Sequence, residues 1–149
     1  MAVKLAAVEQ SMSTRVAPKA DLPFEEALAA AAATPADESP WERLEAAVVS
    51  DEGKARQLLD FYRARLGEAL PKPVAGVLSH RAARFASDCF GENAPETIEV
   101  LRAVLKAAPE ADWAFRPLVV GLTMAERWRE VLDAYDARLG VGMAAERRA

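Results

Sequence analysis

One twelve-residue segment occurs twice in this 149-residue chain, and it constrains the fold more than any other feature. Arg56–Gly67 reads RQLLDFYRARLG and Arg129–Gly140 reads REVLDAYDARLG, so eight of the twelve positions are identical. The shared letters include the runs Leu-Asp-x-Tyr and Ala-Arg-Leu-Gly, which chance rarely produces together. A duplicated segment at this separation is typical of repeat proteins, in which each unit packs against its neighbours.

Apolar residues recur at helical spacing in both copies and once more between them. Steps of three and four residues place the members of each set on one face of an α-helix. The three sets are Ala55, Leu58, Leu59, Tyr62 and Leu66; Thr97, Val100, Leu101, Val104 and Ala108; and Trp128, Val131, Leu132, Tyr135 and Leu139. The chain is 52% hydrophobic and only 7% aromatic, and much of the hydrophobic share is alanine, the best helix former. We therefore predict an all-α fold.

Capping residues, prolines and glycines set the predicted helix ends. Ser39, Asn93 and Thr123 each precede a glutamate by three residues, which is the pattern of a capping box. Gly67 suits a left-handed helix end, and Pro117 should kink the helix that contains it. The predicted helices form three pairs, 40–49 with 54–66, 73–90 with 94–108, and 112–122 with 124–139, after a short helix at 24–33.

These pairs predict a short stack of antiparallel helix hairpins. One pair cannot bury its own apolar face, whereas three stacked pairs bury a continuous core. We assign residues 23–140 to this helical-repeat domain. Residues 1–22 lack a sustained period and are predicted to form a flexible arm, and residues 141–149 are predicted to form a frayed tail.

Charge and cysteine content limit the class of partner. The net charge of −4 and the pI near 5.1 argue against nucleic-acid binding, which usually needs a basic face. Cys89 is the only cysteine, so an intrachain disulfide is excluded and a reducing compartment is expected. No apolar run approaches the roughly 20 residues that span a bilayer. We expect a cytoplasmic protein that binds no membrane.

The residues that carry chemistry do not form a recognisable catalytic set. His80 is the only histidine, and a single helical histidine is most often a surface or capping residue. Cys89 follows Phe85 on the apolar side of its helix and is expected to be a small buried side chain. Glycine-rich phosphate loops are missing from the sequence. The expectation is a non-enzymatic protein without a metal or a cofactor.

Three tryptophans separate into two groups. Trp41 and Trp128 are in phase with the core stripes, which favours a structural role. Trp113 lies on the opposite side of its helix from Leu118 and Leu122, so we expect it to be an exposed anchor for a partner.

Several segments resemble the second helices of tetratricopeptide repeats. They are Gly91-Glu92-Asn93-Ala94-Pro95-Glu96 with the closing Ala108-Pro109, Arg127 to Tyr135, and Phe24-Glu25-Glu26-Ala27-Leu28. The resemblance covers residues 40–140 and implies a short right-handed α-solenoid whose first helices line a groove. The small residue that this family places at the helix crossing is replaced by Glu45, Phe85 or Val119. A half-a-tetratricopeptide or HEAT-like array and a helical bundle therefore stay open as alternatives.

The resemblance implies a function in binding or scaffolding other proteins. The residues expected to line the groove are Arg81, Arg84, Trp113 and Arg116. Arginines clamp carboxylates in two-point fashion, so an acidic peptide or a chain terminus is the predicted partner, and a merely solvated arginine face is the alternative. A second function class is a self-assembling module, a homo-oligomer that stacks through the exposed apolar end of its last helix pair.

Overall fold

The structure, a computed structural model, describes residues 24–148. In this range the chain folds into seven helices and no strand: α2 Phe24–Ala33, α3 Glu38–Val48, α4 Glu52–Leu66, α5 Lys72–Phe90, α6 Pro95–Ala107, α7 Asp112–Met124 and α8 Trp128–Glu146. The predicted all-α class is confirmed. The arm predicted at residues 1–22 lies outside the described residues.

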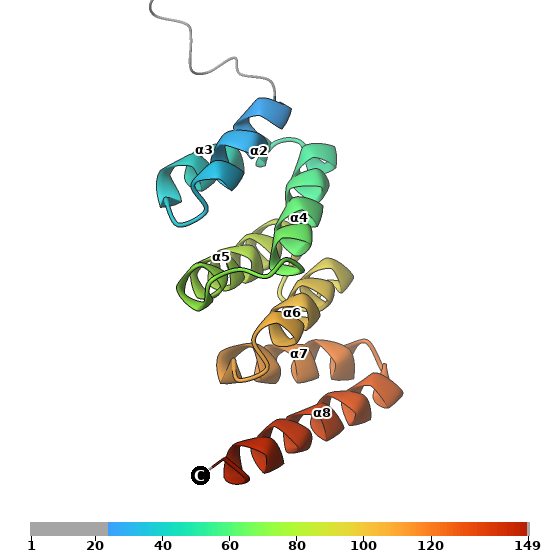
Figure 1. Ribbon diagram of the computed structural model, residues 1–149. Helices are drawn as coiled ribbons and strands as arrows, with labels where there is room; N and C mark the ends of the chain where they lie inside the picture. Colours follow the sequence, from blue (N-terminus) through green and yellow to red (C-terminus); the bar gives the residue numbers. More distant parts are fainter. Residues whose placement is uncertain (1–23, 149) are drawn as a thin grey trace, which may run out of the picture.

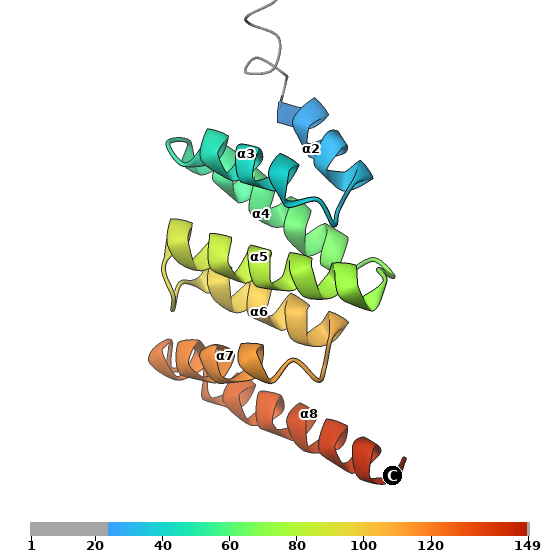
Figure 2. The same cartoon turned by 90° about the vertical axis from the view of Figure 1, so that its left-hand side faces the viewer.

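The helices follow one another along an elongated molecule, from α2 at one end to α8 at the other (Figure 1). Each helix contacts the next one in sequence, and α4 also contacts α6. Figure 2 shows α3 and α5 on the near side of the array, with α4 and α6 behind them. The sequence neighbours are therefore also the neighbours in space.

Aromatic side chains join α3, α4 and α5. Trp41 of α3 stacks on Tyr62 of α4 with ring centroids 4.9 Å apart, and Tyr62 lies 5.9 Å from Phe85 of α5. All three rings are buried. Aromatic contacts of this kind contribute about 0.5–1.5 kcal/mol beyond the area that they bury. The expected structural role of Trp41 agrees with this position.

The two copies of the repeated segment have opposite environments. In α4, Leu59, Tyr62 and Leu66 are buried. Their counterparts in α8 are largely exposed: Leu132 by 66%, Tyr135 by 49% and Leu139 by 65%. Trp128 and Met143 continue this row, which we name the α8 stripe: Trp128, Leu132, Tyr135, Leu139 and Met143.

The prediction that Trp128, Leu132, Tyr135 and Leu139 are core residues is therefore wrong, and so is the structural role expected for Trp128. Val131, the fifth member of that predicted set, is partly buried against the core. The physical reason lies in the tertiary contacts of the two helices. α4 is covered by α5 and α6, whereas α8 contacts α7 through a different side, on which Val131 and Ala134 are partly buried against the core. None of the residues of α8 is fully buried.

None of the three predicted capping residues caps a helix. Asp37 precedes α3 and accepts a hydrogen bond from the Ser39 N–H at 3.1 Å, so Ser39 lies inside the helix. α6 begins at Pro95 without a side-chain cap, because proline at the first position is already set for helical geometry, and Asn93 stays outside. Thr123 lies within α7.

Two helix ends also differ from expectation. Gly67 has a right-handed conformation, with φ −74°, and not the predicted left-handed one. The left-handed residue after α7 is Glu126, with φ 56°. Its N–H donates to the Thr123 carbonyl at 3.0 Å, and the Arg127 N–H donates to the Leu122 carbonyl at 2.9 Å. These two bonds form a Schellman motif that ends α7.

The last helix is longer than predicted. α8 continues through Gly140 to Glu146, so residues 141–146 are helical and not a frayed tail. Glycine in a helix costs about 1 kcal/mol relative to alanine. The helix nevertheless continues past Gly140, and Val141 lies on the side of α8 that is turned towards α6 and α7. α7 likewise continues as one helix through Pro117.

Candidate partner-binding face

Two matching rows of exposed side chains lie on α5 and α7. In each helix the residues follow one another at steps of three and four, and the two rows are 36 residues apart in sequence. We name this surface the α5–α7 face: Val77, His80 and Arg84 of α5, and Trp113, Arg116 and Val120 of α7. All six side chains are exposed. The surface is therefore available to a partner.

The sequence places these residues outward because the core occupies another side of each helix. Leu78 and Ala82 of α5 and Leu118 and Leu122 of α7 are buried. At 100° per residue, the exposed rows lie roughly 100–180° from these positions. Because each helix turns its buried side towards the core, both exposed rows face the solvent.

A ring stack joins the two rows. The His80 and Trp113 rings are stacked with centroids 3.9 Å apart and planes inclined by 21°. Trp113 still exposes 36% of its surface. The indole is therefore held in place by α5 and remains open to solvent, which limits the side-chain entropy lost when it contacts a ligand. The exposure expected of Trp113 agrees with the structure.

Two arginines supply positive charge at this face. Arg84 is 61% exposed, and its Nη2 lies 3.9 Å from Glu45 Oε2, a weak contact at the limit of an ion pair. Arg116 is exposed and forms no ion pair with any residue between 24 and 148. Both guanidinium groups can still form two-point hydrogen bonds to a carboxylate.

Arg81 does not belong to this face, contrary to its predicted place in the groove. Only 5% of its side chain is exposed, and its Nη1 donates to Glu45 Oε2 at 3.2 Å. The other oxygen of Glu45 accepts a hydrogen bond from the Tyr62 hydroxyl at 2.6 Å. Arg81 is therefore a structural residue that ties α5 to α3 and α4, because its helix position faces the core.

This buried triad shifts two pKa values. Burial raises the pKa of Tyr62 far above its ordinary value, and the hydrogen bond to the Glu45 carboxylate raises it further. Burial acts to lower the pKa of Arg81, but its attraction to Glu45 outweighs that effect and raises the pKa. Tyr62 therefore stays protonated and Arg81 stays charged at neutral pH.

A recess lies between α6, α7 and α8 and has a volume of about 450 Å³. Its wall is apolar, with Leu105, Phe115 and Leu118 among the lining residues. The charges at its rim are largely paired within the chain: Arg102 with Glu130, and Arg138 with Asp112. Because few polar groups are left to orient a ligand, this recess is a weaker candidate than the α5–α7 face.

No family model, curated protein or solved structure matches this chain.

Cys89 was expected to be buried and is exposed. It lies in the last turn of α5, on the side that is buried earlier in the helix. Here that side borders a surface depression that Val49 and Ser50 also line. Partial burial and the neighbouring Asp88 raise the pKa of the Cys89 thiol. The thiol is therefore less ionised at neutral pH than an ordinary cysteine.

Residues 24–148 contain no group of three histidine, cysteine, aspartate or glutamate side chains that could hold a metal ion. None of the helices in the same range has the length and hydropathy needed to cross a bilayer.

The sequence interpretation missed three members of the face: Val77, His80 and Val120. Their signal was present as a spacing of three and four residues around Arg84 and Trp113 on the side opposite the core. It was overlooked because valine and histidine on a helix are individually uninformative. The two rows become one surface only when α5 and α7 are placed side by side.

Proposed function

We propose that this chain is a non-enzymatic protein-interaction module that holds a partner segment against the α5–α7 face. The observation that carries the proposal is the stacked pair of His80 and Trp113, flanked by the exposed cations Arg84 and Arg116. An exposed tryptophan beside arginines is the composition found at the energetic centres of protein interfaces.

The module is a short tetratricopeptide-like α-solenoid in this proposal. Two features support it: contacts between each helix and the next one, and the sequence repeat at a separation of 73 residues. In such an array the first helices of successive pairs present one continuous surface to a ligand. α5 and α7 are first helices in this scheme, so a partner segment crosses two neighbouring repeats.

The chemistry of the face defines the partner. Val77, Trp113 and Val120 provide apolar contacts, whereas Arg84 and Arg116 provide positive charge. An acidic peptide that also carries an apolar or aromatic residue satisfies both. The face is open, so the partner is held as an extended or helical segment and not as an enclosed small molecule.

The test is selection of peptides from a random library displayed on phage, with the full chain immobilised. We expect enrichment of acidic sequences that contain an aromatic or large aliphatic residue. Synthetic versions of these peptides should bind the wild type and lose roughly a hundredfold in affinity to an Arg84→Glu/Arg116→Glu variant, since two favourable charge contacts become repulsive.

The matched control is Arg147→Glu/Arg148→Glu, which makes the same change in net charge at two exposed residues beyond the stretch that the α5–α7 face occupies. It should bind the selected peptides like the wild type. An equal loss of peptide affinity in both variants would mean that the change in net charge explains the effect. Selected peptides without acidic residues, or binding that is unaffected by the Arg84/Arg116 change, would refute the proposal.

A further inference from the structure

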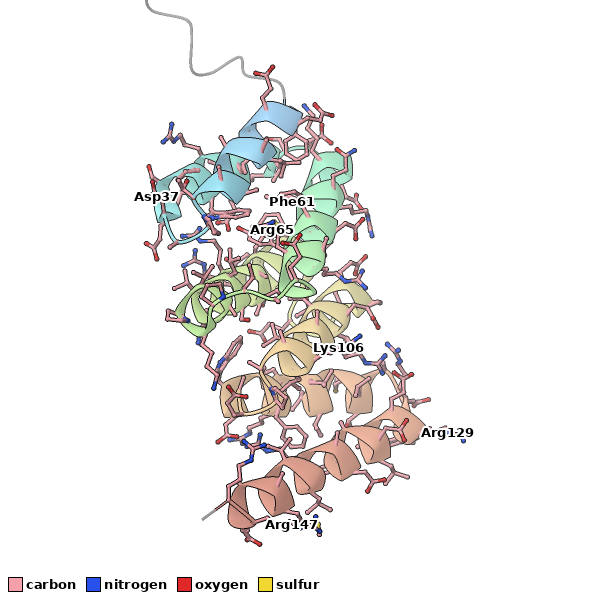
Figure 3. All side chains as sticks on the ribbon, viewed as in Figure 1. Asp37, Phe61, Arg65, Lys106, Arg129 and Arg147 are labelled. Carbon is pink, nitrogen blue, oxygen red and sulfur yellow. The ribbon has the colours of Figure 1, made fainter. Side chains whose placement is uncertain are left out.

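The end of the molecule formed by α8 carries an uncovered apolar surface. The α8 stripe exposes Trp128, Tyr135 and three other large side chains along one side of the helix. Phe115 of α7 lies edge-on to the Tyr135 ring with centroids 5.3 Å apart, but all five side chains stay about half to two thirds exposed, and Figure 1 shows α8 as the last helix of the array. Arg129 and Arg147, labelled in Figure 3, extend from α8 away from the other helices, so charges flank the row without interrupting it.

The internal repeat shows that this row is suited to burial. The same letters in α4 form the centre of the core, where α5 and α6 cover Leu59, Tyr62 and Leu66. Exposed hydrophobic residues are common as single residues, but a continuous row that is core elsewhere in the same chain is not. An exposed row of this kind is typical of an interaction surface.

The size of the row fits a homodimer. Aromatic side chains carry roughly 150–250 Å² each, and leucine and methionine are somewhat smaller, so the five side chains, exposed by about half to two thirds, offer on the order of 500 Å². A standard interface buries about 800 Å² per partner, and homodimer interfaces are about 65% apolar, which requires about 520 Å². The stripe alone supplies that apolar area.

The spacing within the row is also self-complementary. Its first four members follow steps of four, three and four, as in a coiled-coil seam. Trp128 and Met143 lie at equal distances from a centre beside Tyr135, and so do Leu132 and Leu139. An antiparallel copy therefore places the largest side chain opposite a flexible methionine, leucine opposite leucine, and the two Tyr135 rings together.

We infer that two copies of this chain associate through antiparallel packing of their α8 helices. The two-fold axis passes beside Tyr135, so each surface meets an identical one. Antiparallel packing also aligns the two helix dipoles favourably. Asp136 lies beside the axis, so two carboxylates approach each other there, and salt screens their repulsion. The α5–α7 face stays free, because its rows lie on other helices.

The first test is the solution mass of the full chain over a wide concentration series at physiological salt. We expect the mass to rise from one copy to two. Leu132→Asp/Leu139→Asp should lower the association constant roughly a hundredfold or more, because charge replaces central apolar contacts. Val49→Asp/Val120→Asp changes two exposed valines elsewhere and should associate like the wild type.

The same variants separate this inference from the proposed function. Val120→Asp alters the α5–α7 face and should weaken binding of the selected peptides while the dimer persists. Leu132→Asp/Leu139→Asp should bind those peptides and remain monomeric. Failure of one property therefore leaves the other measurable.

The second test probes the axis and does not depend on the aspartate variant folding. In a Cys89→Ala background, Tyr135→Cys should oxidise to a covalent dimer, because the two positions are adjacent across the axis. Ala137→Cys, on the opposite side of α8 facing the α6–α8 recess, should not. Equal cross-linking of both variants would overturn the inference.

Three other outcomes would overturn it as well. They are a wild-type mass of one copy at every concentration, a dimer that survives the Leu132/Leu139 change, and a dimer that is lost when residues 1–22 are deleted. The last result would assign the stripe to that N-terminal segment and not to a second α8.

Discussion

At the scale of single residues, the cluster of buried Tyr62 and Arg81 with half-buried Glu45 best shows how polar groups are accommodated at the edge of the core. One carboxylate accepts the Tyr62 hydroxyl at 2.6 Å and the Arg81 guanidinium at 3.2 Å, so the buried charge is balanced and its hydrogen bonds are made. Clusters of this kind add little stability relative to an apolar core, but removing one partner strongly destabilises the fold. The triad joins α3, α4 and α5.

Stability should depend on pH through Tyr62. Its folded pKa is raised above the unfolded value of 10.0, so the contribution is complete below pH 10 and is lost as pH rises further, when only the unfolded chain releases the proton. At neutral pH, Tyr62→Phe should cost about 2 kcal/mol, a hydrogen bond to a charged group. Above pH 10 the difference from wild type should shrink by up to about 1.4 kcal/mol per pH unit.

Urea unfolding of both proteins between neutral and strongly alkaline pH measures this difference directly. Taking the difference between the two proteins cancels the ionisation of groups that they share. A difference that stays constant through the alkaline range would contradict the assignment of a raised pKa to Tyr62.

At the scale of the helices, the turn between α7 and α8 holds the one residue other than glycine with positive φ among residues 24–148. Glu126 ends α7 in a left-handed conformation that glycine adopts without strain. The Schellman hydrogen bonds of Glu126 and Arg127 fix the angle at which α8 leaves α7. This turn therefore orients the α8 stripe.

Glu126→Gly should stabilise the chain by up to about 1 kcal/mol, because relief of left-handed strain exceeds the added entropy of the unfolded chain. Thermal or urea unfolding followed by circular dichroism measures the change. Glu126→Ala removes the same carboxylate but keeps the side-chain strain, so it should not stabilise. If both variants shift stability equally, charge and not backbone conformation explains the effect.

At the scale of the whole molecule, stability should decline towards the α8 end. Each helix depends on its neighbours for burial, and α8 has neighbours on one side only within residues 24–148. Ion pairs tie α8 to α6 through Arg102 and Glu130 and to α7 through Arg138 and Asp112, whereas within residues 24–148 the part of α8 after Arg138 has none. Arrays of this kind open from the less covered end.

Amide hydrogen exchange provides an internal comparison, because the repeat supplies nearly identical sequences in two environments. Residues 62–66 read YRARL and residues 135–139 read YDARL, so their intrinsic exchange rates are similar. At concentrations low enough for a monomer, residues 135–139 should exchange at least about tenfold faster, since local opening there exposes little buried surface. Equal protection of the two segments in the monomer would contradict this gradient.

The sequence by itself determined the helical class, the existence of the helices α2 to α8 and the residues of the α4 core. These follow from local physics: alanine content, steps of three and four residues, and the prolines and glycines between helices. It also identified Trp113 as exposed, because this residue is out of phase with the buried side of its own helix. Helix ends were less well predicted, since neighbouring polar residues such as Asp37 and Ser39 compete for the same capping role.

Only the tertiary structure decided which apolar rows are buried. The spacing in Tyr62–Leu66 and Tyr135–Leu139 is the same, so no periodicity distinguishes a core helix from the end of the array. Likewise, Arg81 and Arg84 are three residues apart, yet one is buried beside Glu45 and the other points outward. A helix pattern fixes which side is apolar, whereas burial depends on whether another element lies against that side, and that is a property of the assembled chain.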